Sequence, residues 1–210
     1  MTRVIKSPEE RRQELVLTAQ KLFFDKGYSD TTVRDIINAV NGSQGMFYHY
    51  FKSKDDIYKA AMDDFIAKYI NELKKIVLDR EVPFELRIKQ ALFKFKQTFN
   101  DCLSAMYIST SAENENYVLQ IKLRMIYSIA DIMKHLLEEL IDEDKIDRAG
   151  YYKEHIDEAA TFLACGIGGL INKSLFVGNE NTNEVDTKLL NTILSFISQF
   201  LNMDVELIKE

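Results

Sequence analysis

Residues that interrupt helices are scarce in this sequence, which has two prolines and eight glycines in 210 residues. So few breakers favour long helices over many short strands. Cysteine is equally scarce, and Cys102 and Cys165 lie far apart, at no spacing typical of a metal or thiol-redox site. We therefore expect both cysteines to pack in the interior of a protein that needs no disulfide, metal or other cofactor.

Long uncharged hydrophobic runs are also missing. The first ten residues are polar and contain no apolar core of a signal peptide. The longest strongly apolar stretch without a charge, 159–172, is shorter than the ~20 residues that span a bilayer. These absences predict a cytoplasmic protein that does not associate with a membrane.

Positive charge is not in excess either, since 27 Lys and Arg face 33 Asp and Glu, a net charge of −6. The balance differs along the chain, because residues 1–56 hold nine basic and eight acidic side chains. The acidic excess therefore belongs to the remainder. Such a chain is not coated with nucleic acid, but its nearly neutral amino-terminal region is compatible with local binding to DNA.

The spacing of apolar residues predicts helix after helix, so we expect an all-α fold of about nine helices. Short helices come first, followed by longer ones from about residue 53. We place a domain boundary at this change of length, between residues 52 and 53. The expected helices span about 8–26, 32–40, 43–50, 53–78, 83–106, 117–141, 151–176 and 185–203.

Two of the short helices are joined by a tight turn, Asn41-Gly42, which is the arrangement of a helix-turn-helix. Asn and Gly are the residues that best tolerate a left-handed backbone. In the second helix of the pair, Phe47 and Phe51 are four residues apart, and we expect them to face the interior.

The opposite face of that helix carries side chains that suit DNA better than plain solvent. Glutamine pairs with adenine, methionine contacts the thymine methyl group, and tyrosine and histidine donate to phosphates. A glycine lets the backbone approach the duplex closely. Packing of Tyr48 in the core is the alternative interpretation. The outward positions are Gln44, Gly45, Met46, Tyr48, His49 and Lys52.

Three motifs stand out in the short helices: Phe23-x-x-x-Gly27-Tyr28, Thr32-x-x-x-Ile36 and Ser43-x-Gly45-x-Phe47-Tyr48-x-Tyr50-Phe51-x-Ser53-Lys54. With these motifs, the short helices resemble the amino-terminal region of the TetR family of repressors. The rest of the chain resembles the family only in its length and in the order of its helices. One departure lies in the turn, where Asn41-Gly42 stands in place of a glycine followed by an aliphatic residue.

The resemblance implies a transcriptional repressor, not an enzyme, that binds a palindromic double-stranded DNA operator as a homodimer. It implies a helix-turn-helix DNA-binding domain over 1–52 and a ligand-binding and dimerisation domain over 53–210. It assigns phosphate contacts to Thr32 and Lys54, and further contacts to the DNA backbone to Tyr48 and His49. The residues that it places against the bases are Ser43, Gln44, Gly45 and Met46.

The last two predicted helices, about 151–176 and 185–203, carry more apolar positions than one buried face requires. We therefore expect them to be buried on two sides and to form the homodimer interface, as the resemblance also implies. Each glycine within a helix lowers its stability by ~1 kcal/mol, so the three in the first of these helices need a compensating role. Gly166, Gly168 and Gly169 indicate either close helix contact across a dimer or a kink.

The middle helices are rich in aromatic residues. Because a buried tyrosine needs a hydrogen-bond partner, several of them near other polar groups favour a largely apolar pocket. We expect an unidentified, largely apolar small-molecule effector to bind there and release the DNA. Control by a protein partner, without an effector, remains the alternative. The candidate pocket residues are Phe65, Tyr69, Phe99, Cys102, Tyr107, Met125 and Phe162.

Overall fold

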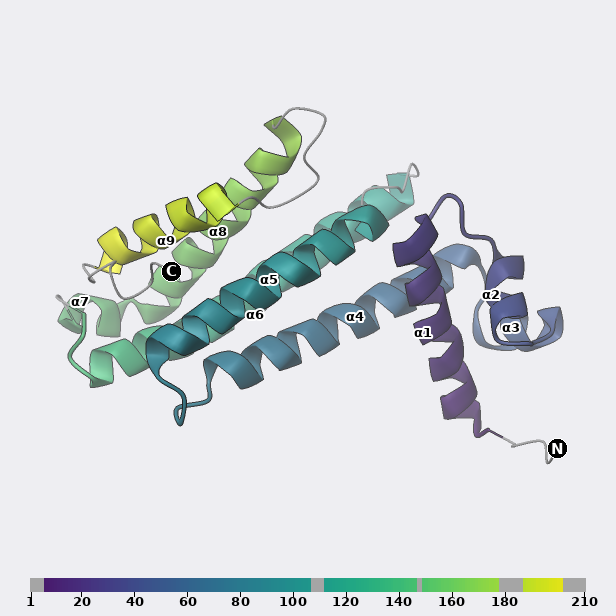
Figure 1. The fold of residues 1–210 in the computed structure, drawn as a ribbon, viewed down its shortest axis with the longest axis horizontal. Helices are drawn as coiled ribbons and strands as arrows, with labels where there is room; N and C mark the ends of the chain where they lie inside the picture. The colour runs from purple at the N-terminus through teal and green to yellow at the C-terminus, as the bar shows by residue number, and fades with distance from the viewer. Residues whose placement is uncertain (1–5, 107–111, 147–148, 178–186, 202–210) are drawn as a thin grey trace. The chain divides into compact units, whose positions relative to one another are not determined.

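The computed structural model describes residues 6–106, 112–146, 149–177 and 187–201, which contain helices and no strand (Figure 1). The predicted all-α fold is confirmed for these residues. The helices are α1 (Pro8–Lys26), α2 (Val33–Ala39), α3 (Gln44–Tyr50), α4 (Lys54–Val77), α5 (Phe84–Met106), α6 (Ala112–Asp142), α7 (Ala149–Glu154), α8 (Ile156–Val177) and α9 (Thr187–Leu201).

The chain divides into two compact units. The first comprises residues 1–68 and 101–121, and the second comprises 69–100 and 122–210. The division cuts through α4, α5 and α6, so the units follow packing and not the order of the helices along the chain. The functional boundary at 52/53 stays a prediction.

Reciprocal capping fixes the start of the first two helices. The Ser7 hydroxyl accepts a hydrogen bond from the Glu10 backbone N–H at 3.2 Å, and the Glu10 carboxylate accepts from the Ser7 N–H at 2.7 Å. The bond from the Ser7 N–H to the carboxylate, followed by one from the Ser7 hydroxyl, holds the pKa of Glu10 below its ordinary value. Thr32 and Asp35 form the same box at α2. Side chains local to each helix therefore satisfy donors that would otherwise lack partners.

A compact apolar core holds α1, α2, α3 and the first turns of α4 together. Its fully buried members come from every one of these helices, so no single helix can shift without opening a cavity. They include Leu15, Phe23, Ile36, Phe47, Phe51 and Ile57. The predicted inward direction of Phe47 and Phe51 is confirmed.

The described helices differ from the expected ones at two places. First, α6 begins at Ala112, within a segment expected to be a loop, because alanine and glutamate favour helix despite their polar neighbours. Second, the helix expected over 151–176 is interrupted at His155. The new helix begins with Asp157 and Glu158 in its first turn, where negative charge is favourable.

Two expectations from composition meet different outcomes. Among the described residues, no helix combines the length and hydropathy that a membrane span requires. Cys165, in contrast, is exposed on α8, so the prediction that it packs in the interior is wrong. The side chain of Cys102 lies outside the described residues.

Candidate nucleic-acid interface and ligand cavity

The turn between α2 and α3 has the geometry of a helix stop built around Asn41. Asn41 adopts a positive φ of 50°. Its N–H donates to the Asn38 carbonyl at 3.1 Å, and the Gly42 N–H donates to the Ile37 carbonyl at 2.9 Å. This pair of bonds is the Schellman motif, in which asparagine takes the left-handed position usually held by glycine. The turn that holds α2 against α3 is therefore intact (Figure 1).

Met46 explains how the turn accommodates Gly42. A Cβ atom added to Gly42 would lie 2.3 Å from the Met46 Cε and 3.2 Å from a Val40 methyl group. The methionine therefore fills the space that a side chain at position 42 would take. Met46 is half-buried, and its tip lies against the turn and not in solvent.

The outer face of α3 is formed by the other predicted base-contacting and backbone-contacting residues. Gln44, Gly45 and His49 are exposed, and Tyr48 is 50% exposed. The alternative in which Tyr48 belongs to the core is therefore wrong. A Cβ atom added to Gly45 would meet nothing within 4 Å, so the backbone is open to an approaching surface there. The face carries no carboxylate that would repel phosphate.

Thr32 and Ser43 stand at the amino-terminal ends of α2 and α3. The Thr32 hydroxyl donates to the Asp35 carboxylate at 2.8 Å, and the Thr32 N–H donates to the same carboxylate at 2.9 Å. The bond from the backbone, followed by that from the hydroxyl, holds the pKa of Asp35 below its ordinary value. The Ser43 hydroxyl accepts from the Met46 N–H at 3.2 Å and keeps its own hydrogen for another acceptor.

Lys54 occupies the first position of α4, where it is half-buried. Its Nζ donates to the Tyr28 carbonyl at 2.9 Å and lies 4.1 Å from the centre of the Tyr28 ring. The Tyr28 hydroxyl donates in turn to Asp55. Lys54 therefore ties the loop after α1 to α4, and one of its three N–H donors is used in doing so.

Two exposed basic residues lie beside the outer face of α3. Arg34, in the first turn of α2, was missing from the predicted set, whereas Lys52, which follows the α3 C-cap Phe51, was predicted to point outward. Sequence spacing alone does not distinguish them from solubilising surface charges. Positive charge beside an open helix face is nevertheless what the phosphate backbone attracts.

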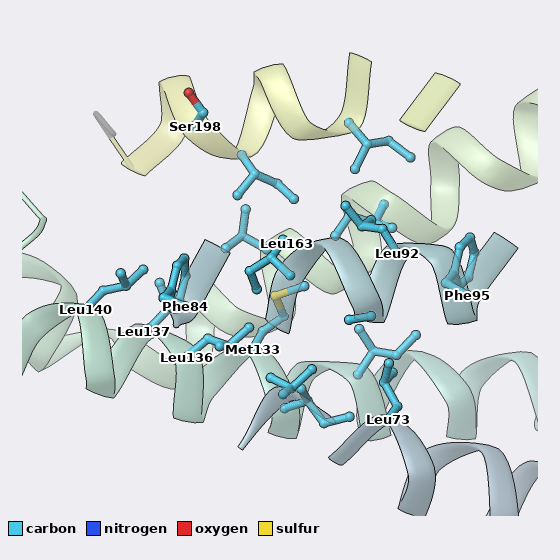
Figure 2. Close-up of a pocket in the computed structure, with 18 of the residues that line it drawn as sticks. Leu73, Phe84, Leu92, Phe95, Met133, Leu136, Leu137, Leu140, Leu163 and Ser198 are labelled. Carbon is cyan, nitrogen blue, oxygen red and sulfur yellow. The ribbon is translucent and has the colours of Figure 1, made fainter. Parts of the chain in front are cut away.

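A cavity of about 130 Å³ lies within the second unit, between α4, α5, α6, α8 and α9 (Figure 2). Its wall is formed by aliphatic and aromatic side chains and one methionine, with Tyr69 and Ser198 carrying the only hydroxyl groups among the lining residues. Figure 2 shows Leu73 on α4 and Leu163 on α8 pointing toward the space between the helices.

Of the candidate pocket residues whose side chains are described, only Tyr69 lines this cavity. Phe65 packs on Phe24 in the first unit, with ring centres 4.9 Å apart. Met125 lies on α6, one helical turn before Ile129, which lines the cavity. Phe162 is 65% exposed, because a helical residue next to Leu163 is turned by about 100° from it. The side chains of Phe99 and Cys102, and the whole of Tyr107, lie outside the described residues.

A buried ion pair, absent from the sequence-based expectations, lies beside the cavity. The Arg87 guanidinium donates to both oxygens of the Glu139 carboxylate and, at 2.6 Å, to the Val77 carbonyl at the end of α4. Arg87 is 1% exposed and Glu139 is 5% exposed. The hydrogen bonds from Arg87 to Glu139 raise the pKa of the guanidinium. The pair joins α4, α5 and α6 at one end of the cavity.

The helix-turn-helix agrees with comparisons to known proteins. KstR2, an HTH-type transcriptional repressor of Mycolicibacterium smegmatis, is 35% identical over 78 residues, which are 37% of this chain and 38% of KstR2. YerO, an HTH-type transcriptional regulator of Bacillus subtilis, is 25% identical over 80% of this chain and 56% of its own length. The chain thus spans between about a third and just over half of these curated relatives.

A solved structure extends the likeness to the whole fold. The transcriptional regulator from Cytophaga hutchinsonii superimposes with a TM-score of 0.64 over 92% of this chain and 96% of its own, at 17% identity. Residues 15–61, which include α2, α3 and the turn between them, match the model of the bacterial regulatory proteins of the tetR family. The helix-turn-helix region of this chain is therefore similar to that of the bacterial regulatory proteins of the tetR family.

Proposed function

We propose that this protein is a transcriptional repressor that binds a palindromic DNA operator as a homodimer and is released by a small molecule. The observation that carries the proposal is the outer face of α3, which is exposed, free of carboxylates and open at Gly45. Its glutamine suits a base edge, and its tyrosine and histidine suit phosphate oxygens. Ser43 adds a hydroxyl donor at the amino-terminal end of the helix, where anions are favoured.

Three substitutions separate the proposed roles of this face. We expect Tyr48→Ala to weaken binding to all DNA sequences equally, whereas Gln44→Ala changes the preferred base. Lys54→Gln lowers the slope of log affinity against log salt by about 0.9, the contribution of one phosphate contact. The measurements are selection of bound sequences from a random DNA pool, followed by anisotropy titrations at several salt concentrations.

The control for these variants is Tyr127→Ala, which removes a tyrosine that is 62% exposed on α6, outside the DNA-binding face. It leaves DNA affinity unchanged. Wild-type binding by both the Tyr48 and the Gln44 variants would show that α3 does not contact DNA through this face. A fall in affinity with an unchanged salt slope in the Lys54 variant would assign that lysine to positioning the loop after α1.

The homodimer is supported by the exposed faces of α8 and α9, which lie side by side (Figure 1). Phe162 and Phe200 stack with their ring centres 5.6 Å apart, and Phe196 is 57% exposed. Added Cβ atoms on Gly166 and Gly169 would meet nothing within 4 Å, so two gaps lie open along α8. Exposed aromatic groups beside such gaps suit a self-complementary surface, on which a second copy buries both.

Phe162→Lys tests this interface. We expect the variant to be monomeric in analytical ultracentrifugation, because a lysine at the centre of an apolar contact cannot be paired there. Its affinity for a palindromic site falls by about 100-fold, since two linked half-site contacts become one. Phe93→Lys is the matched control, because Phe93 is 71% exposed on α5. A dimeric Phe162→Lys protein would place the interface elsewhere.

Release by a ligand is supported by α4, whose two ends carry different parts of the proposed mechanism. Its first residue is Lys54, and its last turns supply Tyr69, Leu73 and Val77 to the cavity wall. A ligand that favours one position of these last turns shifts the equilibrium between the positions that the whole helix can adopt. By linkage, ligand and DNA then weaken each other's binding by the same factor.

A further inference from the structure

The chemistry of the cavity wall restricts what the cavity can bind. Among the described residues that line it, none is charged, and the aliphatic and aromatic groups come from all five surrounding helices. An ion brought into such a wall loses its hydration and gains no counter-ion. A ligand with several hydroxyl groups finds too few hydrogen-bond partners in this wall to replace those that water gave it. An uncharged hydrocarbon group, in contrast, loses only its unfavourable contact with water.

Arg87 is a described cation beside the lining residue Phe84, and its charge is already paired. Glu139 accepts two hydrogen bonds from it, and the Val77 carbonyl accepts a third at 2.6 Å. Phe84 lines the cavity and its ring lies 5.5 Å from Arg87 Cζ, whereas Arg87 itself is not among the lining residues. A ligand carboxylate would have to compete with Glu139 for this arginine.

The size of the space restricts the ligand further. The volume is about 130 Å³, and a dry apolar cavity of ~150 Å³ in another protein binds benzene. One aromatic ring or one short branched alkyl group therefore fills the cavity without rearrangement of its wall.

We infer that the effector of this protein is a small uncharged apolar molecule, or one whose buried part is a single ring or short branched alkyl group. This inference rests on the proposed function for its regulatory meaning. The binding itself is measured without DNA.

Toluene and benzoate are the probes, because they share a ring and differ in charge. Met133 lines the cavity, so its methyl group reports occupation in NMR spectra of the ¹³C-methyl-methionine protein, assigned with Met133→Leu. We expect toluene to shift the Met133 signal and to leave the Met46 signal in place. At ten times its Kd, toluene raises the thermal midpoint by about 3–5 °C. Benzoate binds at least about tenfold more weakly.

Ala91→Leu provides the blocking variant, because Ala91 lines the cavity and the larger side chain fills it. We expect it to reduce the response to toluene at least about tenfold. Gln90→Leu is the matched control, since it adds the same side chain to an exposed position of the same helix. If Ala91→Leu does not fold, the shift of the Met133 signal in the unmodified protein still decides the question.

Two results overturn the inference. Equal or tighter binding of benzoate would show that Arg87 serves an acidic ligand, and the absence of a response to either probe would show that the cavity is a packing defect. Both leave the proposed DNA contacts standing, because those are measured on the ligand-free protein. Conversely, toluene binding with no effect on DNA affinity contradicts release by ligand and supports the ligand class.

Discussion

Replacing Glu139 with alanine is expected to lower the free energy of unfolding by about 3–5 kcal/mol, among the largest losses for a single side chain. The variant leaves Arg87 charged, 1% exposed and without the carboxylate that accepts two of its hydrogen bonds. The Val77 carbonyl remains as an acceptor but cannot balance the charge. The loss therefore measures an uncompensated buried cation and not the net value of the pair.

A double variant distinguishes these two quantities. In Arg87→Met with Glu139→Leu, neither charge remains, and the side chains fill about the same volume. We expect its stability to return to within about 2 kcal/mol of the wild type or above it, because burial of two ions costs solvation that their attraction barely repays. Urea unfolding followed by circular dichroism, at one protein concentration, measures all variants.

The exposed pair of Glu72 and Lys94 is the control for the buried one. The Lys94 Nζ lies 2.6 Å from the Glu72 Oε2, but the Glu72 side chain is 55% exposed. Glu72→Ala should change stability by about 0–1 kcal/mol, since water screens such a pair. An equally small loss in Glu139→Ala would mean that Arg87 finds another acceptor or water, and that the end of the cavity is not sealed.

Short-range rules predicted the helix-turn-helix well, because its features depend on neighbours in sequence. The break between two helices at Asn41-Gly42, the positive φ of Asn41 and the burial of Phe47 each follow from a residue type and a spacing of a few positions. The compensation at Gly42 depends on the rotamer of Met46, and therefore did not follow from spacing. Because the tip of Met46 lies against the turn, its predicted contact with bases stays a prediction.

Long-range packing set the limits of prediction in the second unit. Arg87 and Glu139 are 52 residues apart, so no periodicity relates them. The cavity wall likewise combines residues from five helices, and aromatic content alone did not identify them. Phe162 illustrates the difference, since its helix was predicted but the side facing a neighbour was not. Apolar stripes on two sides of a helix indicate double burial without showing which stripe faces which partner.

Substitutions of Gly45 should change DNA affinity and protein stability in opposite directions, which separates contact with DNA from a structural role. An added Cβ atom meets nothing in the free protein. Alanine at this helical position therefore raises the free energy of unfolding by about 0.5–1 kcal/mol through helix propensity. The larger Gly45→Leu leaves the fold intact and lowers operator affinity by about 100-fold, the value of one or two base contacts that a displaced helix cannot make.

Gly150→Ala is the matched control for both effects. Gly150 is an exposed helical glycine on α7, and an added Cβ atom there also meets nothing within 4 Å. We expect the Gly150→Ala variant to gain similar stability. Anisotropy titrations at fixed salt should show wild-type affinity for the DNA sequence that the unmodified protein selects. Because both glycines are sterically open in the free protein, a difference between them must arise in the complex. Wild-type DNA affinity in Gly45→Leu would place the duplex against another surface and remove the main support for the proposed function.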